Sequence, residues 1–225
     1  GSFLGHVLLH QTINGNEAIL QMEQAGDYPD IIVGCTGGGS NLAGLMFPFL
    51  GQQLRGGQRI DIIGCEPLSC PSFTKGKYAY DHGDMARMTP LIKMHTLGSD
   101  FLPPANHSGG LRYHGMSYHL SHLYDLGLMR AKAYGQKDCF EAGVIFGKQE
   151  GIIPAPEGNH AVKGAIDAAL ECKEKGESKT ILFNLCGHGH FDMTAYDDYF
   201  SGKLADDFYD ENSANQSLSK LPEIA

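Results

Sequence analysis

The chain has 225 residues, of which 42% are hydrophobic and 19% charged, and its formal net charge is -9. This length suffices for a substantial hydrophobic core, and the composition is typical of folded rather than disordered proteins. Only 17 basic residues are present, and they are scattered, which argues against a nucleic-acid partner. The sequence shows no apolar run of membrane-spanning length and no signal peptide, so we expect a cytoplasmic protein.

The hydrophobic pattern predicts helices and strands that alternate along the chain. The first half is expected to hold a helix over 2–25, a buried strand in "PDIIVGCT", a helix from Ser40 and a strand over 59–67. Ser40 is a good N-cap, whereas Pro48 weakens or divides the helix that follows. Periodicity fades over 68–106, which predicts an irregular surface excursion.

Regular patterning returns after residue 106. The expected elements are a helix (117–128), a strand (129–134), two helices (137–151 and 156–176), a strand (179–187) and a helix (192–202). An acidic, polar and frayed tail is expected over 203–225, so that 1–202 form the folded part. Strand and helix alternation predicts an α/β fold with three layers, in which helices flank a mainly parallel sheet.

Three consecutive glycines follow the first predicted strand. Gly37, Gly38 and Gly39 stand directly before Ser40 and Asn41, at the start of a predicted helix. Glycines permit positive φ, so successive N–H groups can converge, and a helix start adds its positive end. The loop lacks the lysine of the GxxxxGK[ST] nucleotide loop and also the GxGxxG spacing. The pattern favours a phosphate-binding loop over a tight turn whose glycines serve packing alone.

Two further loops are expected at the same edge of the sheet, because ligands bind at the carboxyl ends of parallel strands. One loop, 150–161, places Glu157 at the start of a helix, either as a site residue or as a first-turn acid favoured by the helix dipole. The other follows the last strand and contains Cys186, Gly187, His188, His190 and Asp192. Histidine and aspartate can bind metals, but this spacing gives no closed ligand set, so we predict no metal site. Asp192 is instead expected to cap the next helix.

Other candidates carry weaker signals. The stretch "HSGGLRYHG" (107–115) contains Gly110, Arg112 and His114, and it reads either as a substrate loop or as an exposed polar loop. His6 and His10 lack the HExxH form of a metalloprotease, and no GxSxG nucleophile motif is present. The six cysteines have no CxxC spacing, so free thiols are expected.

Five stretches stand in order over residues 1–193: "GSFLGHVLLHQTINGNEA", "VGCTGGGSNLAGLMFP", "GGLRYHG", "GIIPAPEGNHA" and "LFNLCGHGHFDM". Together they resemble the tryptophan synthase β chain in its divergent second type, a fold-type II pyridoxal-phosphate enzyme. The resemblance implies a cytoplasmic lyase of tryptophan biosynthesis. Its reaction would be a β-replacement, in which indole takes the place of the hydroxyl group of L-serine to give L-tryptophan.

The resemblance also implies contacts to pyridoxal 5'-phosphate. The cofactor phosphate would be held by Gly37, Gly38, Gly39, Ser40 and Asn41. Glu157 would lie beside the pyridine ring, and Cys186, followed by Gly187, would pair with the ring nitrogen. The family usually has serine at position 186, and a thiol is the weaker hydrogen-bond donor. Such a contact leaves the ring largely unprotonated, which suits elimination and replacement better than transamination.

Only the C-terminal half of the family's chain is represented. Enzymes of this fold carry the cofactor on a lysine as a Schiff base, and in this family that lysine and a catalytic glutamate lie in the N-terminal part. No lysine here stands in a matching context, so we expect no catalytic residue in this chain. We favour a split enzyme, whose second chain supplies the lysine, over an inactive fragment, and we expect a higher oligomer.

Alternatives remain open at this point. A related serine or threonine dehydratase, or a cysteine synthase-like enzyme, would share the fold and the phosphate loop. A non-catalytic regulatory module could keep the loop and lack the lysine. The sequence also leaves open whether an α subunit binds and whether a monovalent cation lies near the loops, as it does in relatives.

Overall fold

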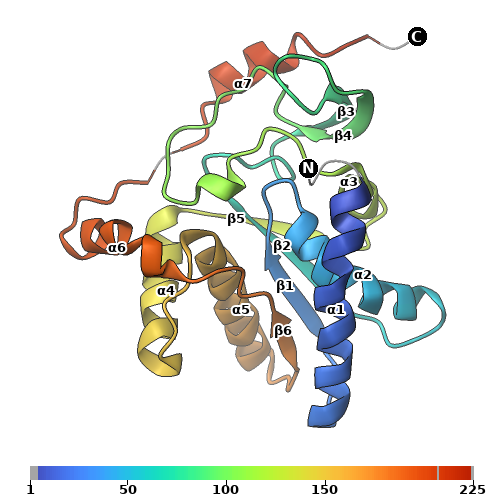
Figure 1. Cartoon of the computed structure of the whole chain (residues 1–225), viewed down its shortest axis with the longest axis vertical. Helices are drawn as coiled ribbons and strands as arrows, with labels where there is room; N and C mark the ends of the chain where they lie inside the picture. The colour runs from blue at the N-terminus through green and yellow to red at the C-terminus, as the bar shows by residue number, and fades with distance from the viewer. Residues whose placement is uncertain (1–4, 207, 224–225) are drawn as a thin grey trace.

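The computed structural model describes residues 5–206 and 208–223, and it places helices on both faces of a sheet (Figure 1). The sheet contains the strands β1 (Ile31–Cys35), β2 (Asp61–Pro67), β5 (Arg130–Tyr134) and β6 (Ile181–Phe183), in the order β5-β2-β1-β6. All three neighbouring pairs are parallel. The predicted α/β fold with a parallel sheet between helices is therefore confirmed. The first residues of the helix expected over 2–25 lie outside the described part of the chain.

One face of the sheet is covered by α1 (Gly5–Ala25), α2 (Ser40–Leu54) and α3 (Tyr118–Asp125). Their apolar side chains form a single buried cluster with Ile32 and Ile62 of the two central strands. Successive residues of a strand point to opposite faces, so the buried run in β1 supplies the core on both sides of the sheet. This explains why the strand reads as continuously apolar rather than alternating.

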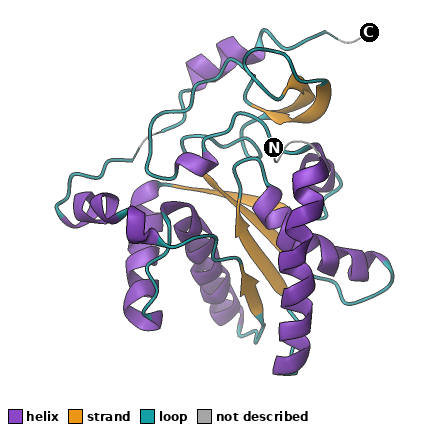
Figure 2. Ribbon diagram, in the orientation of Figure 1, coloured by secondary structure: helices purple, strands orange, loops and turns teal. Residues whose placement is uncertain are grey.

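The opposite face is covered by α4 (Gln136–Glu150) and α5 (Pro156–Lys175), which pack against Val33 and Ile63 of the central strands. The shorter α6 (Met193–Phe200) packs against α4 through an apolar cluster around Phe140 and Tyr196. Figure 2 shows the helices in two groups, with the strands between them. The helix α5 begins beside the site described below, so its packing fixes the position of that helix start.

The helices α1 and α2 approach each other closely because glycine lies at their contact. A Cβ atom on Gly15 would lie 2.3 Å from the carbonyl oxygen of Leu45, and one on Gly44 would lie 2.4 Å from that of Gln11. Pro48 does not divide α2, which is continuous from Ser40 to Leu54. The N-cap is Gly39, at φ 90°, and not Ser40 as expected, because the left-handed turn needed there is open to glycine.

Two segments are more regular than the sequence pattern indicates. The excursion over 68–106 contains an antiparallel hairpin of β3 (Lys77–His82) and β4 (Leu91–Thr96). The acidic tail contains α7 (Glu211–Leu218), with the side chain of Ala214 fully buried. The buried side of the hairpin is partly polar, since Thr96 Oγ1 donates to Asp81 Oδ2 at 2.7 Å. Hydrophobic alternation, the usual sign of a strand, is therefore lacking there.

The order of the strands reverses at β1. The chain continues from β1 to β2 on one side, whereas β6 returns to the other side of β1 much later in the sequence. In open parallel sheets a ligand crevice forms at such a reversal, outside the carboxyl ends of the strands. The loops after β1 and β6 therefore meet there. None of the described helices is long and apolar enough to cross a membrane.

Candidate functional site

The loop after β1 presents a row of backbone N–H groups. Within the described residues, the N–H groups of positions 37–41 donate to no protein acceptor. Thr36 begins this row: its N–H donates to the Cys65 carbonyl at 2.8 Å, whereas its buried Oγ1 has no partner among the described residues. These groups lie at the N-terminus of α2, whose dipole adds positive potential. Such a loop can accept an anion with several oxygen atoms.

Two of the three glycines are required by neighbouring atoms. A Cβ atom on Gly37 would lie 2.6 Å from the carbonyl oxygen of Gly110, and one on Gly39 would lie 2.2 Å from Leu120 Cδ1. Gly38 contributes through its carbonyl, which accepts from the N–H of Ser117 at 3.1 Å. The loop is thus held from behind by the residues at 110–120, and its conformation is set without any side chain of its own.

Glu157 connects two of the predicted loops. Its Oε1 accepts from the N–H of Gly110 at 2.8 Å, so the start of α5 is tied to the short 3-10 helix Gly109–Leu111. A second tie joins α5 to the loop after β6, since the N–H of Ala155 donates to the carbonyl of Gly187 at 3.2 Å. The structure therefore brings Glu157, Gly110 and Gly187 together at one end of the sheet.

Cys186 lies half-buried in the loop after β6, and its sulfur is 3.2 Å from the sulfur of Cys35 at the end of β1. The hydrogen bond from Cys35 lowers the pKa of the Cys186 thiol. The same hydrogen bond, together with complete burial, raises the pKa of Cys35 well above its ordinary value. The negative charge therefore resides on Cys186 when the pair loses a proton, and Cys35 holds the proton between them.

Asn184 joins the loops after β1 and β6 and was not singled out by the sequence. Its Nδ2 donates to Asn41 Oδ1 at 2.7 Å, and the contact spans 143 positions of the chain. The bond orients the Asn41 side chain at the start of α2. A polar residue that interrupts the apolar run of "ILFNL" is the sequence signal that could have indicated it.

Two residues of the predicted substrate loop contact other segments of the chain. Arg112 is exposed, and its guanidinium donates to the carbonyl of Pro103 at 2.6 Å. His114 is buried, and its Nε2 lies 2.9 Å from the carbonyl oxygen of His82, at the hairpin. Both side chains stabilise the segment that follows β4. Of that loop, only Gly110 is tied to Glu157.

The histidines after β6 do not gather into a metal site. Within the described residues, no group of three or more His, Cys, Asp or Glu side chains is arranged to hold a metal ion. His188 Nδ1 accepts from the N–H of His190 at 3.2 Å, so it serves its own loop. Asp192 occupies the N-cap position of α6, as expected, although its side chain makes no capping hydrogen bond.

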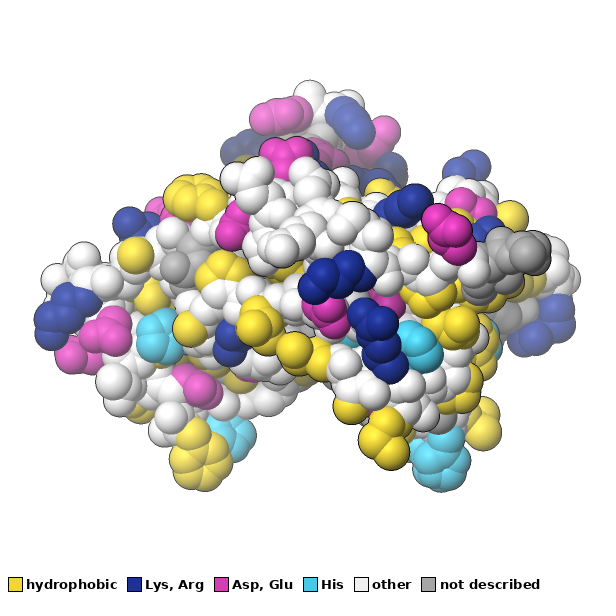
Figure 3. All heavy atoms as spheres, turned by 90° about the horizontal axis from the view of Figure 1, so that it is seen from above, with side chains coloured by type: hydrophobic (Ala, Val, Ile, Leu, Met, Phe, Trp, Pro, Cys, Tyr) yellow, Lys and Arg dark blue, Asp and Glu magenta, His cyan; other side chains and the backbone are white. Residues whose placement is uncertain are grey.

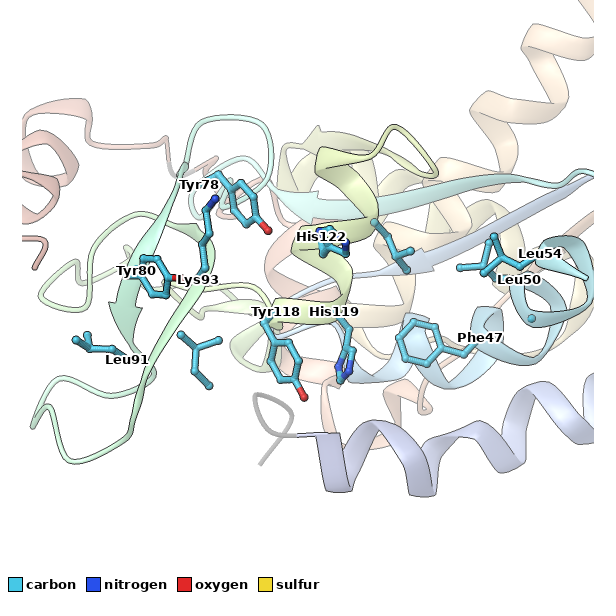
Figure 4. A pocket seen from close by; sticks show the side chains of 13 residues that line it. Phe47, Leu50, Leu54, Tyr78, Tyr80, Leu91, Lys93, Tyr118, His119 and His122 are labelled. Atoms are coloured by element: carbon cyan, nitrogen blue, oxygen red, sulfur yellow. The ribbon is translucent and has the colours of Figure 1, made fainter. Parts of the chain in front are cut away.

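A separate apolar groove of about 700 Å³ lies between α2, α3 and the hairpin. Figure 4 shows aromatic and aliphatic side chains along it, among them Phe47, Leu54, Tyr78 and Tyr118. Among the residues that line it, Lys93 is the one Lys, Arg, Asp or Glu. Elsewhere on the surface, the face in Figure 3 mixes acidic, basic and hydrophobic side chains. The groove is therefore distinct in chemistry from the polar loops at the end of the sheet.

The fold and the site together define an α/β protein with an anion-binding loop at the reversal point of a parallel sheet. Comparison with protein families identifies the family of this protein, because the model for pyridoxal-phosphate-dependent enzymes matches residues 9–187. The chain belongs to this family, and its cofactor is pyridoxal phosphate. The cofactor fits the loop, because a phosphate group needs the free N–H groups that the glycines present.

Similar curated proteins are tryptophan synthase β chains. The "Tryptophan synthase beta chain 2" of Aquifex aeolicus is 58% identical over 209 residues, a match that spans 92% of this chain and 48% of the relative. That of Methanosarcina mazei is 57% identical over 204 residues, with 91% and 46% covered. The "Tryptophan synthase beta chain" of Pyrococcus horikoshii is 50% identical over 222 residues, with 99% and 48% covered. The chain thus spans about half the length of these relatives.

A solved structure confirms the fold alone. The crystal structure of a fungal L-serine ammonia-lyase from Rhizomucor miehei superposes with a TM-score of 0.58, although only 16% of residues are identical. The match covers 85% of this chain and 56% of the other. It carries no information on the reaction of the present chain.

Proposed function

We propose that this chain is the C-terminal part of a tryptophan synthase β enzyme, which acts with a second chain that carries the cofactor-anchoring lysine. The complete enzyme replaces the hydroxyl group of L-serine with indole. The observation that carries this proposal is the meeting of the glycine loop, Glu157 and Cys186 at one end of the sheet. The high identity to β chains over half their length supports it.

The residues of this chain would bind and orient the cofactor. The N–H groups of residues 37–41 hold the phosphate, and Asn41 is fixed for this by Asn184. Pyridoxal phosphate, when bound, supplies an electron sink next to the α carbon of the substrate. Glu157 stands beside the ring, with one oxygen already committed to Gly110.

Cys186 would face the ring nitrogen. Cys35 would help to hold the sulfur in place through the shared hydrogen bond. A thiol is a weak donor, so the ring nitrogen gains little positive charge from it. The residue would thereby favour elimination and replacement over transamination.

A second chain is supported by apolar surface on the described residues. Leu9, Ile13 and Leu20 of α1 are 68%, 56% and 59% exposed. Their spacing places them along one face of the helix, and exposed apolar patches of this kind usually mark contacts with a partner. The relatives contain about as much additional chain as this one, and we propose that the corresponding polypeptide covers this face.

The test is complementation. The purified chain is mixed with a polypeptide that corresponds to the other half of the relatives, in the presence of pyridoxal phosphate, L-serine and indole. We expect L-tryptophan, measured by chromatography, from the mixture and from neither chain alone. Formation of pyruvate without tryptophan would assign the chain to a dehydratase instead. Cofactor binding without any product would favour a regulatory module.

A further inference from the structure

Cys35 ends β1 and Cys186 lies in the loop after the neighbouring strand β6, and their thiols face each other at the site. We propose that this pair is an oxidative modification site, in which a hydroperoxide joins the two sulfurs as a disulfide that other thiols can reduce. The sulfur atoms are 3.2 Å apart, although 151 positions separate the residues in the chain. All six cysteines are free in this structure.

The geometry lies close to that of a disulfide. The S–S bond is about 2.05 Å long, so the two sulfurs need to approach each other by little more than 1 Å, roughly what side-chain rotation supplies. The strands are held in place by the parallel pair of β1 and β6, which continues beyond β6 as the N–H of Asn184 donates to the Val33 carbonyl at 3.0 Å.

The two cysteines differ in the way such a reaction requires. Cys186 is half-buried and reachable from solvent, whereas Cys35 is buried. Their hydrogen bond favours the thiolate on Cys186, and the thiolate is the nucleophile. In the first step this sulfur attacks the peroxide, the O–O bond breaks, and Cys186 becomes a sulfenic acid as water leaves. In the second step the Cys35 sulfur displaces the sulfenic oxygen, its proton leaves with a second water, and two electrons have passed to the peroxide.

The disulfide would have a functional consequence that rests on the proposed function. The Cys186 sulfur is the group assigned to the cofactor ring nitrogen, and a disulfide sulfur has no proton to donate. Oxidation would therefore weaken cofactor binding. Bound cofactor would in turn shield Cys186, so the sensitive form is the chain before it has taken up pyridoxal phosphate.

One other thiol could compete for Cys35. Cys65 is its register partner on β2. However, Cys65 is fully buried, and burial raises its pKa to about 12, so its thiolate is not available to a peroxide. The choice of Cys186 over Cys65 is the feature that separates this proposal from general oxidation of cysteines.

The test is to treat the full chain with a small excess of hydrogen peroxide and to alkylate the remaining thiols after denaturation. We expect the loss of two of the six alkylatable thiols, a mass lower by about 2 Da, and a cross-linked peptide that joins Cys35 to Cys186. Dithiothreitol should restore all six.

The Cys35→Ala variant should form no disulfide, and dimedone should trap its sulfenic acid at Cys186. Cys172→Ala is the matched control, since it lies roughly 20 Å along α5 from Glu157, and it should still lose two thiols.

Three results would overturn the proposal: six thiols that survive the peroxide, a cross-link between Cys35 and Cys65, or a Cys35→Ala variant that still loses two thiols to a disulfide. Equilibrium dialysis with pyridoxal phosphate then tests the consequence. We expect about tenfold weaker binding by the oxidised chain, the effect of one hydrogen bond, and equal binding would refute the coupling. If the reduced chain binds no cofactor even with the complementary polypeptide present, the proposed function fails, while the thiol count still decides whether the modification site exists.

Discussion

At the scale of single residues, the site depends on glycines at positions where a side chain would not fit. Gly39 combines a φ of 90° with a neighbour, Leu120, that leaves no space for a Cβ atom. Gly56 has a similar φ of 95°, but nothing lies within 4 Å of its Cβ position. Substitutions at the two glycines therefore distinguish two effects. Both introduce backbone strain, but only a substitution at Gly39 also causes a steric clash at the loop.

We expect Gly39→Ala to weaken the binding of pyridoxal phosphate by at least about tenfold, or 1.4 kcal/mol, because the loop must shift away from Leu120. Gly56→Ala should have unchanged affinity, although positive φ should destabilise both variants to a similar degree. Equilibrium dialysis gives the affinities, and thermal unfolding gives the stabilities. Equal affinity of the two variants would remove the support for the phosphate loop.

Local motifs predicted much of the candidate site. The glycine loop, Glu157 and Cys186 stand where chain order places them after strands or at a helix start, and the structure brings them together. The contact between Cys35 and Cys186 could not be predicted, because it depends on β6 lying beside β1. The contact that Arg112 makes could not be predicted either, because a polar residue next to glycines carries no sign of which loop it will contact.

At the scale of elements, β2 ends in a buried acid that fixes the next segment. The carboxylate of Glu66 accepts from the N–H of Phe73 at 2.8 Å, from the N–H of Thr74 at 2.9 Å and from Thr74 Oγ1 at 2.6 Å. Burial raises its pKa from 4.5 to about 7, against the effect of these donors. The segment that leads to the hairpin is therefore attached to the sheet through a group that titrates near neutrality.

This raised pKa has a defined consequence for stability. The folded chain binds the Glu66 proton more tightly than the unfolded chain, so this contribution is fully present below pH 4.5 and is lost as the pH rises to about 7. Its size is on the order of 3 kcal/mol. In Glu66→Gln the decline of the unfolding free energy between these pH values should be reduced by that amount, as measured by urea titration.

Glu23→Gln, on the exposed side of α1, is the control for Glu66 and should keep the pH dependence of the unmodified chain. A Glu66→Gln variant with an unchanged slope would show that the carboxyl is not protonated in the folded state. The amide can accept only some of the three donors, so a lower stability at every pH is expected as well.

Most elements of the fold followed from hydrophobic periodicity, and the exceptions have a physical reason. The strands and helices around the sheet have apolar faces, which the pattern reveals. The hairpin of β3 and β4 and the helix α7 bury small or polar groups, such as Asp81 and Ala214, which the hydrophobic pattern does not mark. β6 has three residues, Ile181–Phe183, where a longer strand was expected over 179–187.

At the scale of the whole molecule, one side is more apolar than an isolated protein requires. Leu9, Ile13 and Leu20 form an exposed row on α1, and β6 leaves one edge of the sheet without a neighbour among the described residues. Unpaired edges and apolar rows both promote association. The chain alone should therefore associate with itself unless its complement is present.

We expect Ile13→Glu to weaken complementation by about tenfold, the effect of a moderate interface residue, and to make the free chain more soluble. Gln21→Glu adds the same charge at an exposed position away from the row, and it should leave complementation intact. Native mass spectrometry of the mixtures measures both. If Ile13→Glu associates normally, another face of the chain must bind the complement.

The position of β6 beside β1 also determines when the site can form. Thr180, immediately before β6, donates its N–H to Asp30 Oδ2 across 150 positions of the chain. During synthesis, the glycine loop therefore leaves the ribosome long before the loop that carries Cys186. Closing a contact of such sequence separation is slow compared with forming a helix. The growing chain therefore passes through a period in which its phosphate loop exists without the neighbouring loop that carries Cys186. The phosphate loop can therefore gain this neighbour only after the segment that holds β6 has been synthesised.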